Sequence, residues 1–173
     1  MTQILDPKVA LNVQKAIRQA EDDLVIAIET ALDNCEYIRF GNKKLEESQF
    51  NNLQRVADTT DSAEVIKNFI CYQVGREEKW GRGQNSLAAQ IIRDINFSLN
   101  IRANQIATQN PGADIKYIWI QLIRRYIGYG SRYLTYLNKV RGQENLSIVD
   151  PRVDPQDAEK NTDRVESITQ PGE

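Results

Sequence analysis

The sequence contains no histidine, only two cysteines and no long apolar run. Histidine is the most common general base near neutral pH and the most common zinc ligand, so its absence argues against an enzyme and against a zinc site. Cys35 and Cys71 lie far apart in the chain and indicate neither a disulfide framework nor a metal knuckle. A membrane-spanning helix needs about 18 apolar residues in a row, and the sequence has no such run.

The composition fits one globular domain. The chain has 173 residues, of which 40% are hydrophobic, and this is enough to form one core. Residues 1–17 lack the basic and apolar segments of a secretory signal. Together with the unpaired cysteines, this favours a reducing, cytoplasmic setting.

The net charge of −2 conceals a segregation of charge along the chain. Residues 1–70 contain eight lysines and arginines against twelve aspartates and glutamates, which gives −4. The counts are eleven against four in residues 71–141, which gives +7, and three against eight in residues 142–173, which gives −5. The basic middle indicates an anionic partner, and the acidic end indicates a separate role.

Apolar residues recur at helical spacing in five stretches, and no stretch alternates as a strand would. The first helix is predicted to begin after Asp6-Pro7, an N-cap followed by proline, and to extend to about Asn34. Further helices are predicted over residues 43–58, 61–75, 85–109 and 113–141. We therefore predict an all-α fold. A compact bundle of four or five helices would occupy residues 1–142, followed by a disordered acidic tail over 143–173.

Local signals refine the predicted helices. Asp61 and Glu64 form a capping-box pattern at the start of the third helix, and Gly75 is placed where a left-handed residue would end it. In the last helix, Gly130 projects near the apolar side, where the lack of a side chain allows close helix packing. Gly128 projects toward the cationic side of the same helix.

The stretch YQVGREEKWGRG, residues 72–83, combines three glycines with three cations. It lacks the preceding strand and the GK[ST] signature of a phosphate-binding loop, and Glu77 and Glu78 offset two of its cations. It leads into a helix N-terminus, where free amide groups favour anions. The stretch is therefore either a hinge between two helices or an anion-contact loop with Trp80 and Arg82 at its edge.

The last predicted helix separates its side chains into two faces at about 100° per residue. One face is apolar, and the other carries Arg125, Arg132 and Lys139 at intervals of seven, which makes a stripe roughly 20 Å long. Such a stripe can follow a phosphate backbone while Tyr129 and Tyr136 stack on bases. The simpler interpretation is a solvated polar face with tyrosines at its boundary. Residues 116–141 contain no acidic side chain, and this favours binding over solubility alone.

Two segments, FNNLQRVADTTDSAEVIKNFICYQVGRE (50–77) and WIQLIRRYIGYGSRYLTYLNK (119–139), are joined through a W-x-R-x2-N-S stretch. Together they resemble the helical small subunits of type III CRISPR–Cas effector complexes. The resemblance covers about residues 48–141 and does not extend to the first helix or the acidic tail. It implies a non-catalytic helical bundle that lines a ribonucleoprotein filament and touches neighbouring subunits. By position, it implies RNA contacts at Arg76 and Lys79 and in the last helix.

We therefore predict a non-catalytic, cytoplasmic RNA-binding subunit of a ribonucleoprotein complex of the CRISPR-type antiviral kind, without a cofactor or metal ion. Its expected partners are RNA, as a single strand or a guide–target duplex, other protein subunits and further copies of itself, but no membrane. The predicted contact residues are Arg125, Arg132, Lys139, Arg124, Arg76, Lys79, Arg82, Arg93, Tyr129 and Tyr136. The alternative is a helical protein–protein adaptor whose basic face docks an acidic partner or the chain's own tail.

Overall fold

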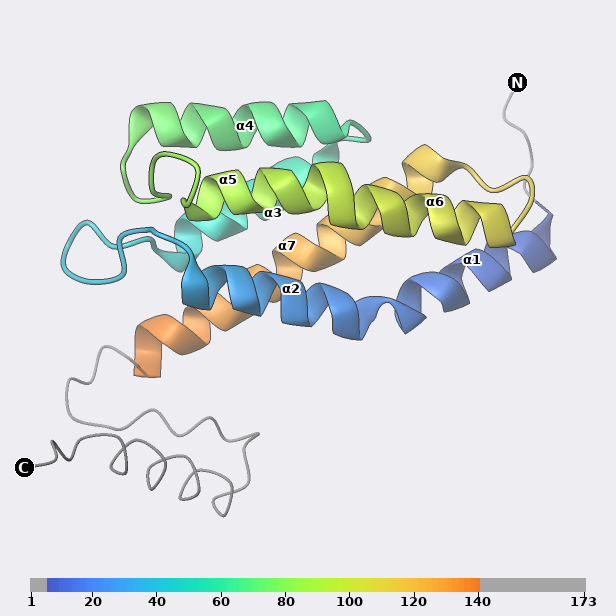
Figure 1. The fold of residues 1–173 in the computed structure, drawn as a ribbon, viewed down its shortest axis with the longest axis horizontal. Helices are drawn as coiled ribbons and strands as arrows, with labels where there is room; N and C mark the ends of the chain where they lie inside the picture. Colours follow the sequence, from blue (N-terminus) through green and yellow to red (C-terminus); the bar gives the residue numbers. More distant parts are fainter. Residues whose placement is uncertain (1–5, 141–173) are drawn as a thin grey trace, which may run out of the picture. The chain divides into compact units, whose positions relative to one another are not determined.

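A computed structural model describes residues 6–140 and has the predicted all-α architecture (Figure 1). Its helices are α1 (Pro7–Gln19), α2 (Glu21–Asn34), α3 (Glu47–Thr59), α4 (Ala63–Arg76), α5 (Leu87–Asp94), α6 (Asn100–Gln109) and α7 (Ile115–Val140), with a π-helical segment, η1 (Ile95–Leu99), between α5 and α6. Because α1–α2 and α5–η1–α6 follow one another with at most one residue between them, the helices form five rods, as predicted. The predicted disordered tail, residues 143–173, lies outside the described residues.

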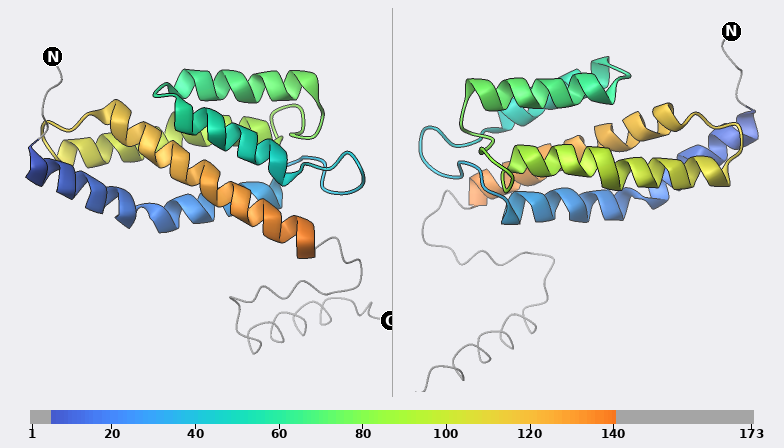
Figure 2. Two further views of the ribbon diagram at one scale, coloured as in Figure 1. Left: turned by 180° about the vertical axis from the view of Figure 1, so that it is seen from behind. Right: turned by 45° about the horizontal axis from the view of Figure 1, so that its top comes forward.

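The rods pack around one core. The rods α1–α2 and α5–η1–α6 lie antiparallel, because α1 packs beside α6 and α2 beside α5. The α3–α4 hairpin packs onto α5 through α4, and α7 crosses the opposite side next to α3 (Figure 2, left). Trp80, Tyr126 and Phe50 are the largest fully buried side chains. Among residues 6–140, no helix has the length and apolar character needed to cross a membrane.

Polar side chains cap the starts of α1, α4 and α5, and the cap of α4 differs from the prediction. The Asp6 carboxylate accepts a hydrogen bond from the Lys8 N–H at 2.8 Å, and the Ser86 hydroxyl accepts one from the Ala89 N–H at 3.2 Å. Both residues lie at the starts of helices that the sequence predicted, one at Asp6-Pro7 and one at the beginning of residues 85–109. The cap of α4, however, is Ser62 and not Asp61, and the Asp61 carboxylate instead contacts α7.

The predicted end of the third helix at Gly75 is also wrong. Gly75 does not adopt a left-handed conformation, and α4 continues to Arg76. The helix ends at Glu77, whose extended backbone redirects the chain while its N–H still donates to the Gln73 carbonyl. An extended residue ends a helix without requiring glycine, so the glycine signal was misleading here.

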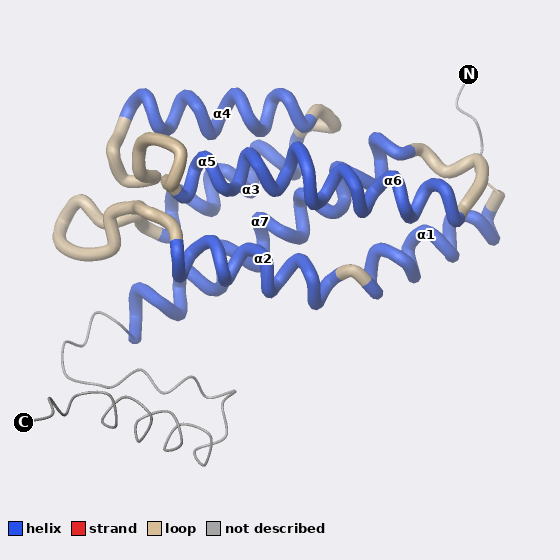
Figure 3. Tube along the Cα trace, viewed as in Figure 1, coloured by secondary structure: helices blue, strands red, loops and turns tan. Residues whose placement is uncertain are grey.

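Two irregularities interrupt the predicted long helices, and Figure 3 shows the first of them as a short loop between α1 and α2. The first helix breaks at Ala20, directly before three acidic residues that occupy the first turn of α2, where the helix dipole favours negative charge. The fourth helix contains η1, and the Trp119 indole N–H donates to the Ile95 carbonyl at 2.9 Å. The apolar spacing continues through both places, so the sequence pattern indicated neither the break at Ala20 nor the π-helical segment.

Residues 72–76 of the stretch YQVGREEKWGRG end α4, and residues 77–83 belong to a connector that backbone hydrogen bonds hold in place. The Ile38 N–H donates to the Lys79 carbonyl at 3.1 Å, and the Leu87 N–H donates to the Glu36 carbonyl at 3.0 Å. These bonds tie the α4–α5 connector to the α2–α3 connector. Trp80 is only 1% exposed, so it anchors this connector in the core and cannot form an exposed edge for an anion.

Gly130 allows the close packing of α7 that the sequence predicted. A Cβ atom at this position would lie 2.7 Å from both Ile28 Cγ1 and Phe50 Cε1, whereas one at Gly128 would meet only the Gln54 amide at 3.6 Å. We expect Gly130→Ala to lower the free energy of unfolding by about 1–2 kcal/mol, because overpacking outweighs the gain in helix propensity. Gly128→Ala should instead raise it by about 0.5 kcal/mol. Urea unfolding followed by circular dichroism measures both, and equal shifts would contradict this packing.

Candidate nucleic-acid interface

Helix α7 is held along two edges, which leaves one outward line of side chains. On the α3 side, the Ser131 hydroxyl donates to Asn51 Oδ1 at 2.7 Å. On the α2 side, the Tyr133 hydroxyl donates to Asp33 Oδ2 at 2.9 Å. By helical spacing, the outward line between these edges consists of Gln121, Arg125, Gly128, Arg132, Thr135 and Lys139.

Arg132 and Lys139 are the free cations of this line. Both side chains are exposed, and neither forms an ion pair within residues 6–140. The Arg132 guanidinium carbon lies 5.6 Å from the centre of the Tyr129 ring, in a cation–π arrangement. The two cations keep the seven-residue interval that the sequence indicated, so both reach the same side of α7.

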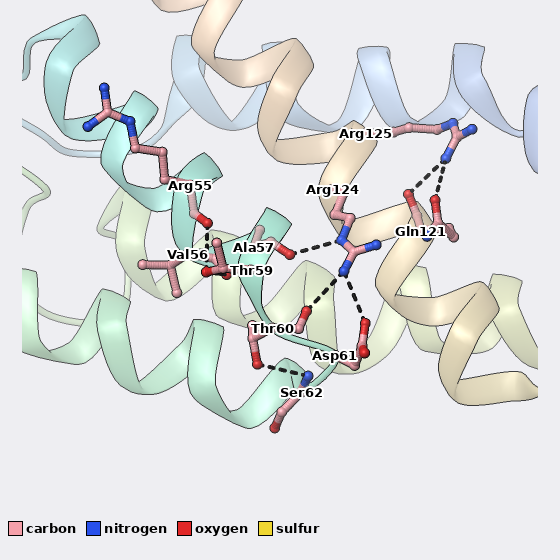
Figure 4. Close-up of polar contacts among 10 residues, drawn as sticks. All are labelled: Arg55, Val56, Ala57, Thr59, Thr60, Asp61, Ser62, Gln121, Arg124 and Arg125. Atoms are coloured by element: carbon pink, nitrogen blue, oxygen red, sulfur yellow. Dashed lines mark hydrogen bonds and ion pairs between the residues drawn. The ribbon is translucent and has the colours of Figure 1, made fainter.

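Arg125 lies on the outward line of α7, but an ion pair partly neutralises its charge. Its Nε donates to Glu21 Oε1 at 3.2 Å, and its Nη1 donates to the carbonyl and side-chain oxygens of Gln121 at 3.3 Å (Figure 4). Glu21 stands at the start of α2, 104 residues away in sequence, so helical periodicity could not reveal the pair. Arg125 therefore joins α2 to α7 as well as lining the outward surface.

Arg124 does not belong to the line. Its Nε donates to the Ala57 carbonyl at 2.9 Å, and its Nη2 donates to the Thr60 carbonyl and to Asp61 Oδ1, each at 3.1 Å (Figure 4). These carbonyls end α3, where a cation is favoured by the helix dipole. Arg124 is thus a cap for a neighbouring helix, and the expectation that it flanks a phosphate contact gains no support from this geometry.

The two predicted stacking tyrosines face α2. Burial and the charge of Glu21 raise the pKa of Tyr129, so its hydroxyl stays protonated near neutral pH. The Tyr136 ring stacks on Tyr133 with 5.8 Å between ring centres, and its hydroxyl oxygen is buried with no hydrogen-bond partner among the described residues. The Tyr129 ring therefore remains available for stacking beside Arg132, whereas the Tyr136 ring packs against Tyr133.

The other four predicted contact residues lie in or beside the α4–α5 connector, and each has an internal partner. The contacts are Arg76 with Glu77 at 2.7 Å, Lys79 with Glu77 at 3.4 Å, Arg82 with Glu78 at 3.2 Å, and Arg93 with the Gln84 carbonyl at 2.7 Å. The structure therefore divides the ten predicted residues between α7 and this connector. Arg132 and Lys139 of the α7 group, and Arg93 beside the connector, are exposed without an ion pair within residues 6–140, but the Arg93 guanidinium donates to the Gln84 carbonyl and to the Gln90 side-chain oxygen.

Sequence reasoning missed Arg55. It lies on α3, is exposed, and forms no ion pair within residues 6–140; its guanidinium extends away from the other side chains drawn in Figure 4. Its polar position in a predicted helix was visible, but nothing in the sequence indicated that α3 lies next to α7. We call Arg55 and the outward line of α7 the α3–α7 face.

Among the described residues, no group of three or more cysteine, aspartate or glutamate side chains is arranged to hold a metal ion. Comparison of the chain with protein-family models, with curated proteins and with solved structures finds no match.

Proposed function

We propose that this protein is a non-catalytic RNA-binding subunit of a ribonucleoprotein complex and that it contacts the RNA backbone through the α3–α7 face. One observation carries the proposal: Arg132 and Lys139 are exposed and form no ion pair within residues 6–140, and they lie in a stretch of 26 residues, 116–141, that has no acidic side chain. A face that serves only solubility commonly mixes charges of both signs. The likeness to type III CRISPR–Cas small subunits suggests an antiviral complex in the cytoplasm.

The mode of binding follows from the available groups. Arg55, Arg132 and Lys139 can each neutralise one phosphate, and Tyr129 can support a base beside Arg132. No base-reading constellation is built into the face, so binding should depend weakly on sequence. Three phosphate contacts on a single strand predict a slope of about −2 in a plot of log affinity against log salt concentration.

Filter binding of a labelled single-stranded RNA tests the proposal. We expect the double charge reversal Arg132→Glu/Lys139→Glu to weaken binding by about tenfold to a hundredfold at about 50 mM salt and to flatten the salt slope by about 1.4. The full chain should be used throughout, and circular dichroism should confirm that each variant folds.

A matched control is present in the chain. Lys8 and Lys15 are also exposed, lie on one helix, and are also seven residues apart. Reversing both makes the same change in net charge on α1 and should leave RNA affinity nearly unchanged. If the two double variants lose affinity equally, net charge and not the α3–α7 face governs binding, and the assignment is wrong.

The alternative is a helical adaptor that docks an acidic protein surface. Two exposed apolar side chains favour a protein contact, because Phe97 is 64% exposed and Ile101, one turn later, is 56% exposed. An adaptor would show no saturable retention of RNA at low salt, so the same filter experiment separates the two functions.

A further inference from the structure

A cavity of 310 Å³ lies between α2 and α5, apart from the α3–α7 face. It is lined by Ala27, Thr30, Ala31, Asn34, Cys35, Gln90 and Asp94. Its volume lies at the lower end of the range for small-molecule sites. The lining combines a small apolar floor with hydroxyl, amide, thiol and carboxylate groups, and Asp94 is its only charged residue.

Asp94 is a buried carboxylate to which no cation among the described residues is bonded, although the charge of Arg93 acts on it. It is 8% exposed, and it forms no ion pair within the described part of the chain. The Tyr126 hydroxyl donates to Oδ2 at 2.6 Å, and the Gln90 amide donates to Oδ1 at 2.8 Å. The neighbouring Arg93 donates elsewhere, to the Gln84 carbonyl and to the Gln90 side-chain oxygen. A carboxylate has about four acceptor sites, so roughly two remain.

The backbone around Asp94 is irregular. Asp94 ends α5 directly before η1, and a π-helical segment is rare and is frequently found at functional sites. Trp119 of α7 bonds the Ile95 carbonyl, and Tyr126 of α7 bonds the carboxylate itself. Two side chains of one helix therefore hold both the irregular segment and the acid, which fixes the position of the acid in the cavity wall.

We propose that this cavity binds a small organic ammonium or guanidinium ligand, with the Asp94 carboxylate as its counter-ion and with Thr30 and Asn34 of α2 as further hydrogen-bond partners. A cationic N–H donor supplies the charge and the donors that the buried carboxylate lacks. A neutral ligand of the same size would leave the charge uncompensated, and an anion would be repelled.

The affinity for such a cation should increase with pH. Burial raises the pKa of Asp94 above its usual range, and binding requires the ionised form, so affinity is low below that pKa and increases as pH rises through it. The other groups near the acid do not reverse this trend. Burial raises the pKa of the Tyr126 hydroxyl and of the Cys35 thiol, which both stay protonated near neutral pH, and the charge of Arg93 lowers the pKa of Asp94 by less than burial raises it.

Isothermal titration calorimetry of the full chain with 1,4-diaminobutane, at about 150 mM salt, tests the proposal. We expect saturable one-to-one binding that weakens at least about tenfold in Asp94→Asn, which keeps the shape of the side chain and removes its charge. The neutral analogue 1,4-butanediol should show no binding. Absence of saturable binding by the wild type, or equal affinity in Asp94→Asn, would overturn the proposal.

Two further variants keep the experiment decisive if Asp94→Asn folds poorly. Thr30→Val alters an exposed position of the cavity wall and should weaken binding about threefold through loss of one hydrogen bond. Asp58→Asn removes an exposed acid on α3 and should change nothing. An equal loss in Asp58→Asn, or no loss in Thr30→Val, would indicate non-specific attraction to surface charge and would refute the site.

Discussion

Replacing Gly81 with alanine is expected to lower the free energy of unfolding by about 3 kcal/mol. Gly81 has a φ of +76°, and a Cβ atom there would lie 2.1 Å from the Glu36 carbonyl oxygen. That oxygen cannot move freely, because it accepts the Leu87 N–H at 3.0 Å. Alanine would therefore add left-handed strain and also separate the two connectors that enclose Trp80.

Gly83 provides the control for this substitution. It has a similar φ of +86°, but a Cβ atom there would meet nothing within 4 Å. Gly83→Ala should therefore cost only the left-handed strain, about 1 kcal/mol. Urea unfolding monitored by circular dichroism compares the two variants. Similar losses would show that the contact between Gly81 and Glu36 contributes nothing beyond backbone strain.

Replacing Arg124 with methionine is expected to lower the free energy of unfolding by about 2 kcal/mol and to leave RNA affinity unchanged. The guanidinium bonds two carbonyls that end α3, and charged donors to such groups contribute about 1.5–3 kcal/mol each, less where water can replace them. The ion pair with Asp61 contributes little, because the Asp61 side chain is 97% exposed. Asp61→Asn should accordingly change stability by less than about 0.5 kcal/mol.

Arg132→Met is the matched comparison, because it removes the same charge from the same helix. We expect it to leave stability within about 0.5 kcal/mol of the wild type and to weaken RNA binding about threefold to tenfold. Arg124 and Arg132, eight residues apart on α7, thus separate a structural role from a binding role. If Arg124→Met reduces RNA affinity as strongly as Arg132→Met while the protein stays folded, our division of the predicted contact residues is wrong.

Local signals determined most of the fold. Helical spacing predicted all five rods, and the cap at Asp6 was placed correctly because capping depends on residues close in sequence. The break at Ala20 and the π-helical segment were missed, since neither contains proline or glycine and the latter is bonded by Trp119 from a distant helix. The local periodicity of a sequence does not reveal tertiary contacts of this kind.

The candidate site was predicted less completely, for the same reason. The seven-residue spacing in the sequence correctly predicted that Arg125, Arg132 and Lys139 lie on one side of α7. Glu21, which pairs with Arg125, lies 104 residues away in sequence, so this spacing could not reveal that the charge of Arg125 is partly neutralised. Arg55 was missed because the adjacency of α3 and α7 follows from the packing and not from either helix alone.

Photocrosslinking from a single position gives the most direct test of the central claim, that RNA lies along the α3–α7 face. Thr135 stands on the outward line, three residues after Arg132 and four before Lys139, and a photoreactive phenylalanine analogue there should crosslink to bound single-stranded RNA on irradiation. The same analogue at Asn68, an exposed position of α4, should not. Crosslinking from Thr135 but not from Asn68 is the predicted result. Equal crosslinking from both positions, or crosslinking from Asn68 alone, would contradict it.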